Sequence, residues 1–374
     1  MAWIFWAAVA VIGHTYLGYP AWLWLSCWWR PRRIASGPCF PSISIVMVVR
    51  NEEAVLQRKL KSLLQLNYPS DQIEIMVVSD GSTDGTNRML SDFARTPRTR
   101  IIVSSNSRGK AAGLNDAMTA SPRGEVVVFT DVRQTIEPDA VRLLMQNFAD
   151  PRVGGASGEL MLGDPDSGEV FGGMGLYWKI EKKIREMESL SGSVVGATGA
   201  FYAVRTELVA PLPAETVLDD VYIPMQVVRQ GKRVVFNPRA RAWDVPDQGT
   251  EREFSRKVRT LGGNYQLMRL APWLLGSNNP VWFRFVSHKV MRLLVPFALV
   301  ALLIASCSLS GAIYRAALVL QVAFYGLSVW AWLQPKRGPL AKAADAALTF
   351  VVLNTAAMVA FANFITRRRA AWSR

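Results

Sequence analysis

The sequence predicts an α/β domain that is built on a parallel sheet and flanked by transmembrane helices. Between about residues 40 and 275, short apolar runs alternate with amphipathic stretches, as in a soluble α/β domain. Residues 1–29 and three stretches near the C-terminus are instead almost entirely apolar, and each has about the 20 residues needed to span a bilayer. We therefore divide the chain into an N-terminal transmembrane anchor (1–29), a central domain ending in interfacial helices (40–275), and a C-terminal interfacial and transmembrane region (276–374).

The N-terminal apolar segment is predicted to be an uncleaved anchor. Met1 to Trp29 contains no acidic or basic residue and no Ala-x-Ala-like cleavage site, and Arg30, Arg32 and Arg33 follow it directly. By the positive-inside rule this basic cluster places the central domain in the cytoplasm. We expect an integral membrane protein, most simply of a bacterial inner membrane.

The first half of the central domain alternates strictly between strands and helices. The predicted strands are continuous apolar runs, which are typical of a parallel sheet covered on both faces; they lie at residues 42–49, 72–80, 100–105 and 125–131. In such sheets, ligands bind outside the carboxyl ends of the strands. Side chains that directly follow these strands are therefore candidates for a binding site.

Four charged residues occupy such positions. Glu52 follows the first strand, Asp80 ends the second, Lys110 opens a helix after Gly109, and Asp131 ends the fourth strand. Carboxylates at strand ends are suitable acceptors for the diol of a ribose. Each residue also has a structural interpretation: Glu52 as an acid at a helix N-terminus, Asp80 as a turn former, and Lys110 as a solvated charge.

The second half of the domain is less regular. Residues 175–190 form an amphipathic helix, which we expect to pack on the core or, alternatively, to contact a membrane-borne acceptor. A Gly-rich loop at 196–205 leads into a short strand. Asp219 and Asp220 then open a helix, for which we expect Asp219 to be the cap of a helix that begins at Val221.

The net charge and the cysteine content limit the classes of partner and of site that the sequence predicts. The net charge of +14 favours an anionic membrane surface or a diphosphate over nucleic acid, because much of the excess lies beside the apolar segments. Cys27, Cys39 and Cys307 are far apart in the sequence and predict neither a disulfide framework nor a zinc site. His14 and His288 belong to no catalytic pattern.

Seven motifs follow one another between residues 42 and 275: VVRNEE, VVSDGSTDGT, RGKAAGLNDA, VVFTDVRQ, GATGAFYAVR, LDDVYIP and RKVRTLGGN. In this order they resemble the membrane-bound, inverting glycosyltransferases of family 2, which have the GT-A fold and make bacterial polysaccharides or glycolipids. Singly each motif is weak, but their order is specific.

The resemblance implies a role for each candidate residue. Glu52, Asp80, Lys110 and Asp131 would bind the donor nucleotide, and Asp220 would be the catalytic base. Gly199, Ala200, Phe201 and Asp219 would lie in the acceptor region. Inversion by direct displacement needs only one carboxylate, which takes the proton of the acceptor hydroxyl.

Two departures from the family pattern affect the diphosphate and the metal. Arg256 and Arg259 match the first and fourth positions of the Gln-x-x-Arg-Trp motif, but the Trp is absent, which puts processive synthesis in doubt. Arg133 replaces the second acid of the Asp-x-Asp motif, so Asp131 alone would bind Mg²⁺ or Mn²⁺. Arg133 could neutralise phosphate itself or pair with an acid elsewhere in the pocket.

The function expected from this resemblance is transfer of a sugar from a nucleotide sugar, most simply a UDP-sugar, to a lipid-linked or saccharide acceptor at the cytoplasmic membrane face. The expected partners are therefore these two substrates and membrane lipids, without nucleic acid. Arg133 and the altered arginine motif leave open an inactive membrane scaffold that keeps the nucleotide-sugar-binding fold. A transporter is disfavoured because its spans would need ionisable groups.

Overall fold

The computed structural model describes residues 1–164, 175–245, 250–333 and 340–366. Within them, one eight-stranded sheet has the order β3-β2-β1-β4-β7-β6-β8-β5. The strands are β1 (Ile43–Val49), β2 (Ile73–Asp80), β3 (Thr99–Ser104), β4 (Val126–Thr130), β5 (Thr135–Ile136), β6 (Val153–Leu162), β7 (Phe201–Arg205) and β8 (Arg233–Asp244).

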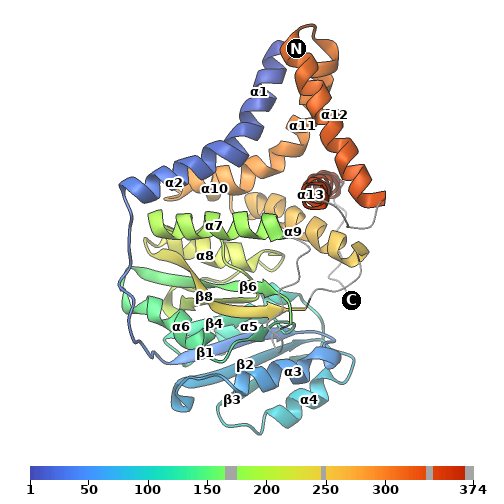
Figure 1. Cartoon of the computed structure of the whole chain (residues 1–374). Coiled ribbons are helices and arrows are strands. Elements are labelled where there is room, and N and C mark those ends of the chain that lie inside the picture. Colours follow the sequence, from blue (N-terminus) through green and yellow to red (C-terminus); the bar gives the residue numbers. More distant parts are fainter. Residues whose placement is uncertain (165–174, 246–249, 334–339, 367–374) are drawn as a thin grey trace.

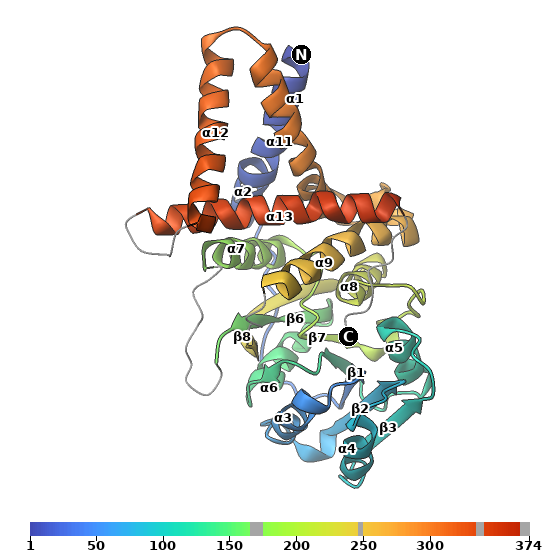
Figure 2. The same ribbon diagram turned by 90° about the vertical axis from the view of Figure 1, so that its right-hand side faces the viewer.

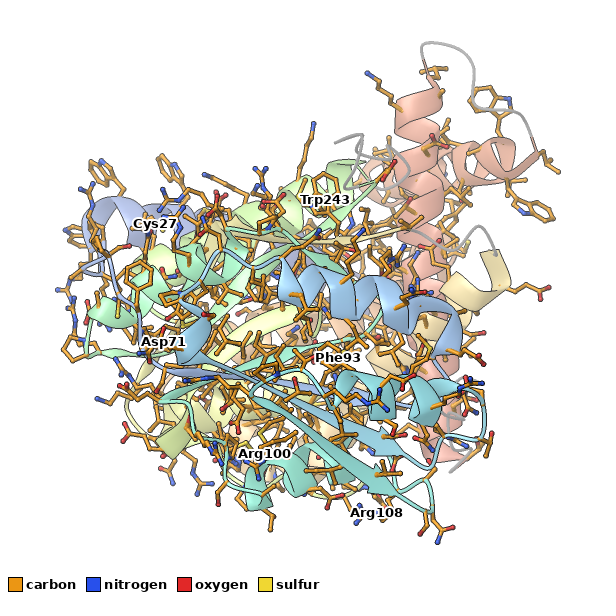
Figure 3. All side chains as sticks on the ribbon, turned by 90° about the horizontal axis from the view of Figure 1, so that it is seen from below. Cys27, Asp71, Phe93, Arg100, Arg108 and Trp243 are labelled. Carbon is orange, nitrogen blue, oxygen red and sulfur yellow. The ribbon has the colours of Figure 1, made fainter. Side chains whose placement is uncertain are left out.

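The four strands predicted from the sequence form the parallel half of the sheet. β1 lies between β2 and β4, and β3 pairs with the outer side of β2, in each case in parallel register. Seen from below, Arg100 lies on the β3 side of the sheet and Trp243 on the opposite side, that of β8 (Figure 3). All seven residues of β1 and all five of β4 are buried, so the predicted parallel sheet covered on both faces is confirmed.

The other half of the sheet is mixed. β7 runs antiparallel to both β4 and β6, β6 pairs with β8 in parallel, and the short β5 pairs antiparallel with the end of β8. Because β7 is antiparallel to β4, its first residue lies beside the last residue of β4. The loop before β7 therefore reaches the edge of the sheet at which the parallel strands end.

Helices cover both faces of the sheet. Their bounds are α3 (Glu53–Leu64), α4 (Thr86–Phe93), α5 (Lys110–Thr119), α6 (Ala140–Met145), α7 (Gly175–Ser191), α8 (Asp219–Arg229) and α9 (Thr250–Leu270), with a short 3₁₀ turn η3 (Gln146–Ala149). Leu56 and Leu60 of α3 pack into one hydrophobic cluster, and Leu114 of α5 and Val221 of α8 pack into another. The alternate side chains of the central strands divide between these two clusters.

Among the described residues, four helical segments are long and apolar enough to cross a membrane. The first is Ala2–Trp29, composed of α1 (Ala2–Gly13), a π-helical turn and α2 (Tyr19–Trp29). The others are Trp282–Ser308, which ends in α11 (Met291–Ser308), then α12 (Ala312–Leu333) and α13 (Ala341–Ile365). Helices α1, α11 and α12 rise away from the sheet domain on the side covered by α7 and α9 (Figure 1).

Helix α13 has a different direction from its apolar neighbours. It runs crosswise to α12, over α7 and α9 (Figure 2). Tyr265 of α9 contacts the rings of Phe361 and Phe364, and Gly262 faces Ala360, so the two helices approach closely. α13 therefore lies between the sheet domain and the rising helices.

The amphipathic helix α7 packs on the core and on the N-terminal anchor. Ile184 forms a buried cluster with Tyr19 and Leu23 of α2. Glu188, which has no exposed surface, accepts a hydrogen bond from the Tyr19 hydroxyl and contacts Nδ1 of His288 at 2.7 Å. His288 also lies 3.0 Å from Glu181, so its two ring nitrogens join α7 to the segment that leads into α11.

Candidate active site

The site centres on a lysine held between two carboxylates. Lys110 Nζ lies 2.8 Å from Asp131 Oδ1 and 3.1 Å from Asp219 Oδ1. The pKa of Lys110 is held well above its usual range, since the attraction of Asp131 and Asp219 outweighs the effect of burial. Three charges from the ends of β4, α5 and α8 thus meet at one point.

The sheet topology explains this meeting. Thr130 pairs with Phe201 across β4 and β7, and the Thr130 hydroxyl donates to the carbonyl oxygen of Ala200 at 2.8 Å. Gly199 therefore lies beside Asp131. A Cβ at Gly199 would stand 3.4 Å from Asp131 Oδ2 and 3.3 Å from Asp220 Oδ2, so any larger residue would crowd both carboxylates.

Asp220 has the electrostatic environment of a general base. Its Oδ2 accepts a hydrogen bond from the Gly199 amide at 3.1 Å. Burial and the nearby charge of Asp219 raise the pKa of Asp220 to about 6, while Lys110 and Lys289 oppose the rise. A carboxyl group with this pKa is ionised at neutral pH and still basic enough to take a proton in a transition state.

Glu52 and Asp80 contribute differently. Burial raises the pKa of Glu52, and the charges of Arg133 and Asp131 also act on it, which places Glu52 at the same edge of the sheet. Asp80 has no exposed surface and accepts hydrogen bonds from the Ser107 hydroxyl and the amides of Arg108 and Gly109. It holds the loop before α5, as the turn interpretation expects, and does not present a free carboxylate to a nucleotide.

Arg133 is paired within the domain. Its guanidinium lies 3.3 Å from Asp244 at the end of β8, and Gln134 donates to the other oxygen of the same carboxylate. Of the two roles considered for Arg133, the salt bridge is therefore present.

The side chains of this site supply only part of the ligands that a divalent cation needs. In the described ranges no cluster of three or more His, Cys, Asp or Glu side chains has the arrangement of a metal site. The Asp131 side chain is 39% exposed and contacts Lys110 through Oδ1, and its Oδ2 has no hydrogen-bond partner among the described residues. One carboxylate with water and substrate phosphates is a set that Mg²⁺ commonly accepts. The fit therefore requires the donor diphosphate to supply the other ligands.

The arginine helix α9 packs against the start of α8. A Cβ at Gly263 would lie 2.7 Å from Leu218, and the Gln266 side chain accepts a hydrogen bond from the Val217 amide. Arg259 and Arg256 precede Gly263 by four and seven residues, so all three share one helical face. Arg259 forms no ion pair with any residue that the structure describes. Arg259 thus lies about one helical turn from the point at which α9 contacts Leu218, the residue before Asp219.

Two expectations from the sequence are wrong in detail. Asp219 does not cap a helix that begins at Val221; it is the first residue of α8, and its carboxylate contacts Lys110 and the Tyr202 hydroxyl. Phe201 is fully buried in the core and cannot contact an acceptor, because β7 turns alternate side chains inward. The pairing with Lys110 outcompetes the cap, since an ion pair satisfies this buried carboxylate better.

The sequence analysis missed Lys59. Its ammonium group is buried and donates to the Thr130 hydroxyl at 2.6 Å and to the Gln134 carbonyl at 2.8 Å, and burial lowers its pKa to about 7. It thereby fixes both sides of the loop that carries Asp131. The available signal is that Lys59 interrupts the apolar face of α3 between Leu56 and Leu63.

Lys289 was also missed. It belongs to the π-helical turn Val286–Val290, at the start of the second candidate span. Its Nζ lies 3.8 Å from the position that a Cβ of Gly196 would take, beside the Asp220 carbonyl. The charge of Lys289 lowers the pKa of the Asp220 carboxyl, so a cation from a candidate membrane segment acts on the base, which composition alone does not reveal.

A family model connects this geometry to known proteins. Residues 44–211 match the model described as Glycosyl transferase family 2. The chain contains a family 2 glycosyltransferase domain. The match spans β1 to β7 and the loop before β7, so it includes Glu52, Lys110, Asp131 and Gly199.

Characterised relatives of the glycosyltransferase domain make polysaccharide and glycolipid. The chain is 23% identical over 237 residues to a poly-β-1,6-N-acetyl-D-glucosamine synthase of Staphylococcus epidermidis, covering 62% of this chain and 56% of that protein. It is 24% identical over 281 residues to a β-monoglucosyldiacylglycerol synthase of Synechocystis, covering 71% and 57%. The chain thus spans little more than half the length of these relatives.

A solved structure shows the same fold over almost the whole chain. It is a mannosyltransferase from Pyrobaculum calidifontis in complex with GDP-Man and Mn²⁺, with a TM-score of 0.73 at 20% identity. The likeness covers 98% of this chain and 100% of that one, so it includes the apolar helices. The GT-A fold with flanking apolar helices, expected from the sequence, is confirmed.

Proposed function

We propose that the protein is an inverting glycosyltransferase that moves a sugar from a nucleotide sugar to a lipid-linked or saccharide acceptor at the cytoplasmic membrane face. The observation that carries this proposal is the convergence of Lys110, Asp131, Asp219 and Asp220 at one edge of the sheet. The family match and the two synthase relatives support it.

The residues divide the chemistry between them. Asp220 accepts the proton of the acceptor hydroxyl as that oxygen attacks the anomeric carbon. Arg259 and Lys110 stabilise the negative charge that develops on the departing nucleoside diphosphate. Asp219 and Asp131 hold Lys110 in place before the donor arrives. Because one displacement occurs, the anomeric configuration of the product is opposite to that of the donor.

Asp131 would hold a divalent cation together with the donor diphosphate. The cation would neutralise the leaving group as a Lewis acid. The neighbouring mannosyltransferase structure contains Mn²⁺, which supports this assignment. We expect excess chelator to abolish transfer by the purified protein and added Mn²⁺ or Mg²⁺ to restore it. If activity is undiminished in chelator, Lys110 and Arg259 alone neutralise the charge of the leaving diphosphate.

The crosswise direction of α13 supports a specific membrane topology. If α1, α11 and α12 span the bilayer and α13 lies along its cytoplasmic surface, both ends of α13 stay on the domain side (Figure 2). The C-terminal Arg367, Arg368 and Arg369, which lie outside the described residues, then remain in the cytoplasm. This arrangement satisfies the positive-inside rule, which three C-terminal spans would violate.

A donor screen tests the proposed function. The protein in nanodiscs, supplied with a native lipid extract, is incubated with a panel of UDP-sugars and GDP-sugars, and release of nucleoside diphosphate is measured. We expect one donor to be consumed only when extract is present, since transfer needs the acceptor. A UDP-sugar is the first candidate, and the GDP-Man bound by the structural neighbour makes GDP-sugars the second.

The same screen tests the alternative of an inactive scaffold. The observation that favours a scaffold is Arg133, which is paired to Asp244 where a second metal-binding acid would stand. A scaffold would bind a nucleotide sugar and release no diphosphate with any donor or extract. Turnover with any donor would exclude it.

Lys289 gives a test through the pH dependence of transfer. Its positive charge lowers the pKa of Asp220, so Lys289→Met should raise that pKa. The base must be ionised, so the acidic limb of the pH–rate profile of Lys289→Met should move to higher pH. Lys289→Arg retains the positive charge and should show the acidic limb at the same pH as the native protein. A limb that is unchanged in Lys289→Met would show that Lys289 does not act on the base.

A further inference from the structure

A cavity of about 280 Å³ lies on the side of the domain away from the catalytic centre. The chain segment that follows α2, the C-terminal part of α7 and the middle of β8 form its walls. β8 is three strand positions away from β4, or about 14 Å. None of the catalytic candidates lines the cavity, so it is a separate site.

Three arginines define the chemistry of this cavity. Arg32, Arg33 and Arg239 line it, together with the polar residues Ser189 and Asn237. Within the described ranges, none of these three guanidinium groups forms an ion pair or a hydrogen bond. The one acid in the lining, Glu186, is paired with Lys183 at 3.2 Å.

A fourth guanidinium lies directly behind the wall. Arg233 donates hydrogen bonds to the carbonyl oxygens of Ser189 and Gly192, and its buried Nη1 has no partner among the described residues. Burial and the charges of Arg152 and Arg32 lower the pKa of Arg233, while Asp150 opposes this. The charge of Arg32 on the cavity wall therefore acts on Arg233 behind it.

The cavity is lined by residues that follow the first candidate membrane span closely in the chain. Trp28 and Trp29, at the end of α2, are 77% and 75% exposed, as expected for residues at a membrane interface. Arg32 follows Trp29 by three residues, which limits its distance to about 10 Å. A ligand that enters from the membrane surface would meet Arg32 and Arg33 first.

We propose that this cavity binds a phosphate group, supplied by the headgroup of an anionic membrane lipid. Guanidinium groups bind phosphate through paired N–H donors, which suits several arginines around one anion better than lysines would. A bound headgroup would fasten the linker between the anchor and the domain, and so fix the height of the domain relative to the bilayer. The proposal does not depend on the donor or acceptor of the transferase.

Lipid titration of the purified full-length chain tests the site. In detergent, the protein is titrated by calorimetry with short-chain phosphatidylglycerol, with phosphatidylcholine of the same chain length, and with inorganic phosphate. We expect saturable binding of phosphatidylglycerol only. If inorganic phosphate binds saturably with the same affinity, the cavity is a phosphate site whose ligand is a free anion and not a lipid headgroup. No saturable binding of either would overturn the proposal.

Matched variants separate the cavity from general charge attraction. Arg32→Gln/Arg239→Gln should weaken phosphatidylglycerol binding about tenfold or more, because charge-assisted hydrogen bonds are lost. Arg30→Gln/Arg95→Gln removes the same net charge from positions that are exposed, as Arg32 and Arg239 are, but that do not line the cavity, and should leave affinity within about twofold. Equal weakening in both pairs would overturn the proposal.

A second variant distinguishes the loss of the binding site from misfolding of the protein. Ser36→Phe places a large side chain in the cavity without changing charge, since Ser36 is exposed and lines it. It should reduce binding as strongly as the arginine pair while the melting temperature stays close to that of the native protein. Native affinity in Ser36→Phe would place the lipid elsewhere.

Discussion

Asp220→Asn is expected to reduce transfer between about 10²- and 10⁴-fold, which is the usual contribution of a general base. The amide keeps the volume of the side chain, and its oxygen can still accept the hydrogen bond from Gly199. The amide cannot take up the proton of the acceptor hydroxyl. Donor binding should therefore remain, and the loss should lie in the rate of sugar transfer measured at saturating donor.

The pH profile of the native protein belongs to the same prediction. The pKa of Asp220 is raised to about 6, so the carboxyl group is protonated and inactive below that pH. The rate should rise as the pH increases through about 6. Asp92→Asn, a matched control on the exposed face of α4, should keep the native rate and profile. Normal turnover in Asp220→Asn would show that another group is the base.

The second large effect is expected from Arg259. Replacing it by Gln removes the guanidinium on the domain side of α9, and we expect donor affinity to fall about tenfold to a hundredfold, as for loss of a hydrogen bond to a charged group. The rate should fall as well, because the same cation stabilises the leaving group. Both can be measured by titration with the donor and by release of nucleoside diphosphate.

Lys257→Gln is the matched control for Arg259. Lys257 lies on the same helix and is paired with Glu253 at 2.8 Å, so it should not contact the donor. If Arg259→Gln behaves like the control, the basic face of α9 serves contact with anionic lipid instead.

The parallel half of the sheet could be predicted because continuous apolar strands alternate with amphipathic helices. The order of the remaining strands could not, since the pairing of β6, β7 and β8 depends on contacts that are distant in sequence. For the same reason the sequence did not show that Gly199 reaches Asp131 or that Phe201 turns into the core.

The acids of the site were predicted because strand ends place them at one edge. Their partners were not, because ion pairs depend on three-dimensional distance. The pairing of Lys110 with Asp131 and Asp219, and that of Arg133 with Asp244, appear only in the fold. Lys59 and Lys289 lie in segments whose sequence pattern predicts a packed helix and an interfacial helix, and neither pattern indicates that these charges belong to the site.

The central claim is that carboxylates from several strand and helix ends meet the α9 arginine around one diphosphate. A structure of the full chain with its nucleoside diphosphate and Mn²⁺ tests this most directly. We expect the diphosphate within hydrogen-bonding distance of Lys110 and Arg259, Asp131 at the cation, and Asp220 on the side away from the leaving group. A diphosphate bound elsewhere, or Arg259 turned towards the lipid, would contradict the proposed arrangement of the active site.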